Sequence, residues 1–290
     1  MAALAHRASI GAPTTASCAD LSAADFDRVR RLIFDRAGIS LHAGKQAMVY
    51  SRLTRRLREV GLDSFDVYLD RLEAARGPEA ELEWQEFVNC LTTNLTAFFR
   101  EGHHFEELAV ALAARRGQRT RIWCNAASTG EEPYSIAMTV VETLGADAGV
   151  EILCTDIDTR VLTTARAGVY DADSKGLDTA RVKRHFLRGT GSNAGLIRVR
   201  PEVAALVRFA PFNLMSPRWS FAQPFDAVFC RNVLIYFDAP TQQAVVARMH
   251  GALASGGLLF IGHSETLADS KALFGLRGKT VYRRLGGPGA

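Results

Sequence analysis

The stretch RIWCNAASTGEEPYSIAMTVV, residues 121–141, decides the fold class of this chain. It begins with a short apolar run that predicts a buried strand, continues through a turn of small residues with one glycine, and ends in a helical run. Similar apolar runs alternate with helical stretches further along the chain, which is typical of a parallel sheet with crossover helices. We therefore predict an α/β domain with a doubly wound sheet.

The strands of this domain are expected near residues 121–126, 151–156, 206–212, 226–231, 257–262 and 280–284. The stretch between the second and third strands is too long for a simple crossover. It contains Gly189, Gly191 and Gly195 among short β-prone segments. We therefore expect a small inserted β subdomain at about residues 170–205.

An all-helical domain is predicted before the sheet, at residues 21–92. In its first helix Ser22 is the expected N-cap, and Gly38 lies where a glycine would end the helix. Apolar residues then repeat at helical spacing up to residue 92. Residues 1–20 are small and polar and lack the apolar core of a secretion signal, so we expect a disordered lead-in there and the sheet domain at residues 93–290.

Composition excludes several classes of protein. The chain has 290 residues, 48% hydrophobic and 23% charged, and no apolar run approaches the about 20 residues that a membrane-spanning helix needs. The cysteines form no CxxC pair; they are Cys18, Cys90, Cys124, Cys154 and Cys230. This odd, scattered set predicts reduced thiols, a cytoplasmic location and no metal site.

Charge is distributed unevenly along the chain. The net charge of +4 does not by itself indicate a nucleic-acid binder. Residues 1–62 carry ten Lys/Arg and five Asp/Glu, whereas residues 63–86 carry two and eight. The first segment is therefore a candidate for contact with an acidic partner.

The turn after the first expected strand is a ligand site by position. In open α/β sheets ligands bind beyond the carboxyl ends of the strands, close to helix N-termini. This turn does not follow the GxGxxG pattern, and Glu131 and Glu132 at the start of the helix would repel a pyrophosphate. The two carboxylates suit a cationic or zwitterionic ligand, although they could also merely complement the helix dipole.

Asp156 ends the second expected strand, 26 residues after Gly130. A carboxylate at this position can accept two hydrogen bonds from ribose hydroxyls, and an acidic helix cap is the alternative. A nucleoside ligand that makes no demand for phosphate binding points to S-adenosylmethionine.

Several longer motifs carry a family resemblance: LTTNLTAFFRE (91–101), ASTGEEPYS (127–135), TDIDT (155–159), FCRNVLIYF (229–237) and GHSE (262–265). In order and spacing they resemble the CheR chemotaxis protein methyltransferases, from about residue 20 to residue 285. Asn125 and Ala126 depart from the small residues or serine expected there. The resemblance implies a Rossmann-like class I methyltransferase sheet preceded by an all-α domain. It also implies transfer of the methyl group of S-adenosylmethionine to glutamate side chains of chemoreceptors, which leaves S-adenosylhomocysteine.

The resemblance also implies roles for individual residues. Cofactor contacts are expected at Asn94, Thr96, Arg100, Glu131, Asp156, Asn213, Leu214, Arg231 and Asn232. Arg100 and Tyr236 are the candidates for orienting the substrate glutamate, whose ionised carboxylate is the nucleophile and requires no general base. The alternatives are a surface salt bridge for Arg100 and a core aromatic for Tyr236.

Receptor contacts are implied at two places. The N-terminal domain would face the acidic methylation helices through Arg52, Arg55, Arg56 and Arg58, which could otherwise be a solvated face. The insertion, with Gly189 and Gly191, would dock a peptide from the receptor's C-terminal tail by strand addition. We expect a monomer without nucleic-acid binding or membrane insertion. A nicotinamide-dependent oxidoreductase and an inactive receptor-binding scaffold are the alternative functions.

Overall fold

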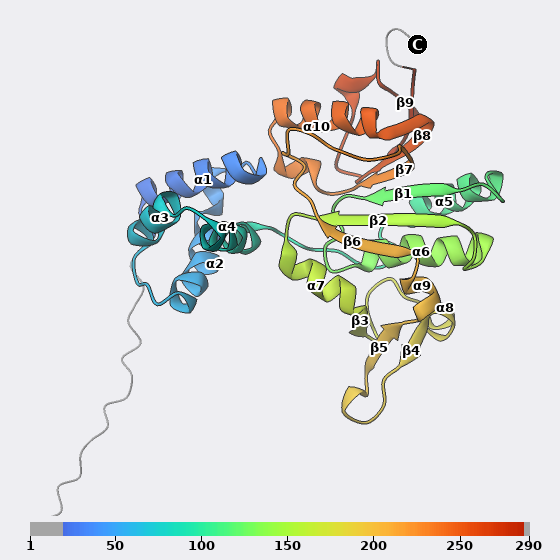
Figure 1. The fold of residues 1–290 in the computed structure, drawn as a ribbon, viewed down its shortest axis with the longest axis horizontal. Coiled ribbons are helices and arrows are strands. Elements are labelled where there is room, and N and C mark those ends of the chain that lie inside the picture. The colour runs from blue at the N-terminus through green and yellow to red at the C-terminus, as the bar shows by residue number, and fades with distance from the viewer. Residues whose placement is uncertain (1–19, 287–290) are drawn as a thin grey trace, which may run out of the picture.

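A computed structural model of the chain describes residues 20–286, which form a helical domain followed by a sheet domain (Figure 1). The disordered lead-in expected at residues 1–20 lies, except for Asp20, outside the described residues, as does Cys18. No helix within residues 20–286 combines the length and the apolar character that crossing a membrane requires.

The helical domain packs its helices around one apolar core. They are α1 (Ala23–Ala37), α2 (Gln46–Glu59), α3 (Phe65–Ala74) and α4 (Pro78–Leu91). The predicted ends of α1 are confirmed: the Ser22 hydroxyl accepts the backbone N–H of Asp25 at 3.1 Å, and Gly38 ends the helix at φ +72°. A side chain at Gly38 would also lie 2.6 Å from the sulfur of Met215, so this glycine lets α1 approach the sheet domain.

The sheet domain contains the predicted doubly wound sheet, in the order β6-β2-β1-β7-β8-β10-β9. Its strands are β1 (Thr120–Cys124), β2 (Val150–Asp156), β6 (Val207–Pro211), β7 (Phe225–Cys230), β8 (Leu253–Ile261), β9 (Phe274–Gly278) and β10 (Val281–Arg284). The first five in spatial order pair in parallel, and β10 is antiparallel to both its neighbours. β9 was not among the strands expected from the sequence.

Helices cover both faces of this sheet (Figure 1). They are α5 (His103–Ala114), α6 (Glu131–Leu144), α7 (Thr159–Ala167) and α10 (Ala239–Ala252). Alternate residues of β1 divide between two cores: Ile122 packs with the buried residues of α5 and α6, and Trp123 packs with Val245 and Met249 of α10. Both faces of the central strands are therefore buried, as a parallel sheet requires.

The predicted insertion is a small antiparallel sheet of order β3-β5-β4. It comprises β3 (Val169–Asp171), β4 (Phe186–Arg188) and β5 (Leu196–Val199), with the short helices α8 (Thr179–His185) and α9 (Pro201–Ala204). Gly189 and Gly191 lie just after β4, and a side chain at Gly189 would collide with the backbone carbonyl of Asn193. β4 is an edge strand, so one side of its backbone is open for pairing.

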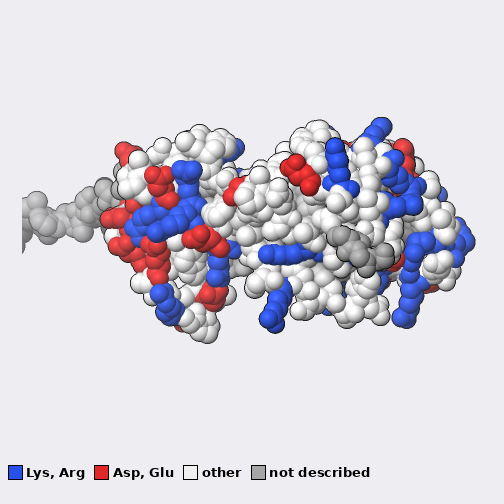
Figure 2. All heavy atoms as spheres, turned by 90° about the horizontal axis from the view of Figure 1, so that it is seen from above, with Lys and Arg blue, Asp and Glu red and all other residues white. Residues whose placement is uncertain are grey.

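The basic and acidic segments noted in the sequence pair largely with each other. Arg28 bonds Asp70 and Glu73, and Arg56 bonds Glu83. Figure 2 shows the resulting mixture of positive and negative side chains over the helical domain. Much of the excess positive charge before residue 62 is thus balanced within the domain.

Candidate functional site

A cavity of about 330 Å³ lies beyond the carboxyl ends of β1, β2, β6 and β7, with the helical domain on its other side. This volume is in the usual range for small-molecule sites, about 300–1,000 Å³. The connection between α1 and α2 contributes Leu41 and His42 to the wall. The predicted site residues that line the cavity are Asn94, Thr96, Arg100, Asp156, Asn213, Leu214, Arg231, Asn232 and Tyr236.

Asp156, the last residue of β2, is buried in the cavity wall. Its Oδ2 accepts the backbone N–H of Ser128 at 2.8 Å, and its Oδ1 accepts that of Asp158 at 2.9 Å. Burial raises the pKa of the carboxyl to about 6, because these N–H donors offset only part of the desolvation. The carboxylate ties together the turns after β1 and β2, and its remaining lone pairs can accept ligand hydroxyls.

Glu132, and not Glu131, lines the cavity at the start of α6. Glu131 accepts the hydroxyl of Thr129 at 2.6 Å, whereas the buried Glu132 forms an ion pair with Arg231. Gly130, at φ +102°, sets the direction in which α6 begins and therefore which of two adjacent glutamates faces inward. The sequence alone does not distinguish them, and the assignment of the cofactor ammonium to Glu131 stays a prediction.

Arg100 and Tyr236 both line the cavity with polar groups that the protein leaves available. The Arg100 guanidinium donates to the carbonyl of Leu95 at 3.2 Å and has no carboxylate partner within residues 20–286. The Tyr236 hydroxyl makes no hydrogen bond to any described residue. A guanidinium without a carboxylate partner and a free phenol hydroxyl that line the same cavity can both donate to an anion.

Two asparagines of the predicted site hold the cavity wall together. The Asn94 amide donates to Asp158 Oδ2 at 2.8 Å, and the same carboxylate caps α7. The Asn213 amide donates to the carbonyl of Arg36 at 2.8 Å, and its oxygen accepts the N–H of Met215. Asn213 therefore joins the end of α1 to the sheet domain.

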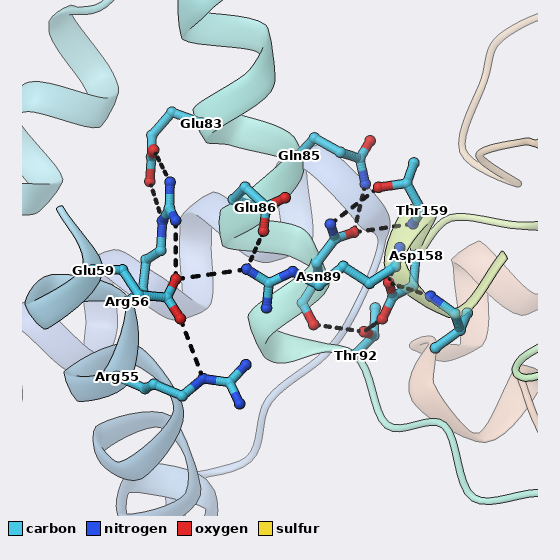
Figure 3. A network of polar contacts seen from close by, with 12 residues as sticks. Arg55, Arg56, Glu59, Glu83, Gln85, Glu86, Asn89, Thr92, Asp158 and Thr159 are labelled. Carbon is cyan, nitrogen blue, oxygen red and sulfur yellow. Dashed lines mark hydrogen bonds and ion pairs between the residues drawn. The ribbon is translucent and has the colours of Figure 1, made fainter. Parts of the chain in front are cut away.

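A polar network at the start of α7 joins the two domains (Figure 3). Asn89 of α4 donates to the hydroxyl of Thr159 at 3.1 Å and accepts its N–H at 3.2 Å. Gln85 donates to the carbonyl of Ile157 at 2.8 Å, and Arg160 pairs with Glu86. These contacts set the position of the helical domain over the cavity.

The arginines of α2 differ in how far they are available to a partner. Arg52 donates to the carbonyl of Thr92 at 2.6 Å, and Arg56 is held by Glu83 with only 17% of its side chain exposed. Arg55 is 69% exposed with a long contact of 3.6 Å to Glu59, and Arg58 is exposed. Of the four predicted receptor contacts, Arg55 and Arg58 thus keep the most accessible guanidinium groups.

Glu101, His103 and His104 are spaced closely enough to hold a metal ion, since their ligand atoms lie within 4.8 Å of one another. Arg231 Nη2, however, lies 3.5 Å from Glu101 Oε2, and a guanidinium at this distance opposes a second cation. Burial and the positive charge of Arg231 lower the pKa of His104 to about 3, and the same positive charge opposes a bound cation. We assign no metal to this group.

Comparison with known proteins agrees with this arrangement. Residues 24–92 match the family described as "CheR methyltransferase, all-alpha domain", and residues 94–283 match "CheR methyltransferase, SAM binding domain". The chain belongs to the CheR methyltransferase family. Chemotaxis protein methyltransferases of Klebsiella aerogenes and Escherichia coli are both 52% identical over 264 residues, which is 90% of this chain and 90% or 91% of theirs. The Borreliella burgdorferi relative is 32% identical over 86% of this chain and 90% of its own length.

Membership in the CheR family makes the sheet domain an S-adenosylmethionine-binding domain, and the cavity fits this cofactor. Asp156 stands at the strand end where a carboxylate binds ribose hydroxyls. Phe212, which follows β6, provides an aromatic wall for an adenine. Arg100, which has no carboxylate partner among the described residues, offers a positive charge for the carboxylate end of the cofactor.

Proposed function

We propose that the protein transfers the methyl group of S-adenosylmethionine to glutamate side chains of chemoreceptors in the cytoplasm. The observation that carries the proposal is the unpaired guanidinium of Arg100 in the same cavity as the free hydroxyl of Tyr236 and the ribose-type carboxylate of Asp156. The names of the relatives, chemotaxis protein methyltransferases, support the choice of pathway.

The residues act by placement. Bound S-adenosylmethionine supplies an electrophilic methyl group, and the substrate carboxylate is already ionised at neutral pH, so no side chain has to remove a proton. Arg100 and Tyr236 orient the carboxylate for in-line attack, and correct alignment of two reactants can contribute about 7–11 kcal/mol. Both charges disappear as the ester and the thioether form, so a single arginine is better than a cluster that would over-stabilise the ionised glutamate.

Two exposed apolar side chains mark where the substrate segment enters. Leu95 is 83% exposed and Ile235 is 49% exposed, and both line the cavity that contains Arg100 and Tyr236. Exposed apolar groups at the mouth of a polar site favour contact with the apolar flank of a protein segment. We place the helix that carries the target glutamate against this pair.

The receptor contacts proposed beyond the cavity follow from the exposed elements. Arg55 and Arg58 of α2 face solvent and suit an acidic helix. The free edge of β4, where Leu187 is 43% exposed, suits a tail peptide that pairs as an added strand.

The proposal is tested by incubating the protein with methyl-labelled S-adenosylmethionine and receptor cytoplasmic fragments. The expected product is receptor label that base releases as methanol, and its absence with every receptor of the source organism would refute the proposal. Tyr236→Phe, which retains the ring and removes only the hydroxyl, should release less labelled methanol than the wild type in the same assay. Calorimetry with S-adenosylhomocysteine and with a nicotinamide dinucleotide separates this proposal from the oxidoreductase alternative.

A further inference from the structure

The GHSE turn, residues 262–265, follows β8 and contributes no side chain to the cavity wall within the described chain. Its Glu265 is buried and accepts backbone N–H groups of the segment that follows β7. Oε1 accepts Leu234 at 2.8 Å and Ile235 at 3.4 Å, and Oε2 accepts Asn232 at 3.0 Å. The N–H of Gly262 also bonds Oε2, at 2.5 Å. One carboxylate thus fixes the short turn that presents Tyr236.

The same GHSE turn reaches the segment that presents Arg100. The His263 ring nitrogen Nδ1 lies 2.9 Å from Glu101 Oε1, and Glu101 follows Arg100 directly in the chain. Arg231, at the end of β7, donates to the carbonyl of Arg100 at 2.5 Å and closes the connection from the other side. The polar groups form a ring that runs from the GHSE turn through Glu101, Arg100 and Arg231 back to Asn232.

The backbone at both segments needs such a restraint. Glu101 has φ +59°, at a cost of about 1–2 kcal/mol for a non-glycine residue, and Asn232 has φ +58°, which asparagine adopts more readily than most side chains. A side chain at Gly262 would collide with the side-chain amide of Asn232 and press against the carboxylate of Glu265, so glycine keeps these groups in place. Groups held in costly conformations keep them only where the surroundings enforce it, and here the enforcing side chains are those of Glu265 and His263.

We propose that Glu265, assisted by His263, is a positioning residue that sets the placement of Tyr236 relative to Arg100 during methyl transfer. The inference rests on the proposed function, since it assigns those two residues to the substrate carboxylate. Burial of Glu265 without a cationic partner would be unfavourable for stability alone, and four N–H donors from the two loops compensate for it. The buried carboxylate of Glu265 therefore serves to hold the loop that presents Tyr236 in one conformation.

Glu265→Gln is the test. In either orientation the amide places an N–H₂ group against backbone N–H donors, so at least one pair of donors loses its acceptor. We expect the turnover number to fall roughly 10- to 100-fold, as for loss of charged hydrogen bonds at a positioned group. His263→Gln, at a side chain 65% exposed, should lower it only about threefold. Ser264→Ala is the matched control, since Ser264 is exposed and makes no side-chain bond to the described residues.

A double-mutant cycle distinguishes positioning from general stability. If Glu265 acts through Tyr236, the turnover lost in Glu265→Gln should shrink to at most about threefold in a Tyr236→Phe background, because the group being positioned has gone. An undiminished loss in that background, or unchanged turnover in the single variant, overturns the inference. If Glu265→Gln does not unfold cooperatively, Glu265→Asp, which retains the charge, replaces it in the same cycle. Wild-type protein that methylates no receptor would instead refute the proposed function.

Discussion

The protonation of one carboxyl should control cofactor binding. The folded protein keeps the proton of Asp156 up to about pH 6, whereas the ordinary value is 3.8, so ionisation of Asp156 costs stability as pH rises through this window. The ionised carboxylate is a stronger acceptor for ribose hydroxyls than the protonated acid, and it offers more acceptor sites. We therefore expect the affinity for S-adenosylhomocysteine to fall below pH 6, by at most about tenfold per pH unit.

Calorimetric titration between pH 5 and pH 8 measures this dependence on Asp156. The control is Asp156→Ala, which should weaken binding at pH 7.5 by about 1.5–3 kcal/mol and remove the step near pH 6. A native profile without that step, or unchanged affinity in the variant, would remove Asp156 from the ribose site.

Substitutions at Arg100 and Tyr236 should differ in kind. Tyr236→Phe deletes a hydroxyl that bonds no described residue. Turnover should therefore slow because the activation free energy rises by about 1–3 kcal/mol. The melting temperature and the cofactor affinity should not change. Arg100→Ala should also weaken cofactor binding, because we expect the guanidinium to contact the methionine carboxylate as well. If both variants lose turnover but bind the cofactor with unchanged affinity, Arg100 does not contribute to cofactor binding. Steady-state kinetics and calorimetry on the same preparations decide it.

Which single residues face the cavity could be predicted only in part. Asp156 could be located because the apolar run that predicts β2 stops at this residue, and the carboxyl end of a strand in such a sheet faces the ligand site. Glu132 could not be preferred over Glu131 from the sequence. Neighbouring side chains of a helix point in different directions, and the conformation of the turn before α6 determines which of the two faces the cavity. The role of Glu265 was not predictable either, since the N–H groups it accepts belong to a segment about 30 residues away in the sequence.

At the scale of single elements, α2 separates accessible from structural arginines. Arg55→Glu and Arg58→Glu should each raise the Michaelis constant for receptor by roughly 3- to 10-fold at low salt, and the effect should fade as salt screens exposed charges. Cofactor affinity should not change. The matched control is Arg119→Glu, an exposed arginine directly before the amino end of β1, whereas the cavity lies beyond the carboxyl end of that strand. Normal receptor kinetics in both α2 variants would show that this face of α2 is exposed to solvent and does not contact the receptor.

Arg56→Glu should behave differently from its neighbours in α2. Reversal places a carboxylate against Glu83 and Glu59, whose bonds to Arg56 it removes, so we expect a loss of roughly 3 kcal/mol of unfolding free energy. Denaturant unfolding measures it, with Arg55→Glu as the comparison. Equal stability of the two variants would show that the pairing of Arg56 with Glu83 contributes little.

The elements themselves follow the sequence where pattern and position agree. β1, β2 and β7 are apolar runs buried on both faces, so their composition identifies them. β9 is different: it is an edge strand with the sequence FGLRG, and pairing with β10 defines it more than any apolar pattern does. The positive charge of the first helices could serve an acidic partner or pair within the domain, and the sequence does not decide between them. Only the packing of α1 against α3 shows that Arg28 pairs with Asp70 and Glu73.

At the scale of the whole molecule, the cavity exists only while the two domains stay together. Its walls come from both, and Asn89, Asn213 and the contact of Ser40 N–H with the Tyr236 carbonyl at 2.8 Å join them. The family match divides the chain between residues 92 and 94, beside this junction. A cofactor bound in the cavity should therefore stabilise the association of the domains as well as the sheet domain.

Asn89→Ala tests this coupling. Asn89 is buried, and its loss leaves the N–H of Thr159 without its acceptor and removes one of the two acceptors of the Gln85 amide, so we expect about 1–3 kcal/mol lower stability. Proteolysis near residues 92–96 should become faster, and S-adenosylhomocysteine should restore protection because we expect it to contact both walls. Thr163→Ala is the matched control, since Thr163 is exposed on α7 and bonds only within that helix. If Asn89→Ala and Thr163→Ala are cleaved equally slowly without ligand, Asn89 does not hold the domains together, and the contacts of Asn213 and Ser40 must suffice.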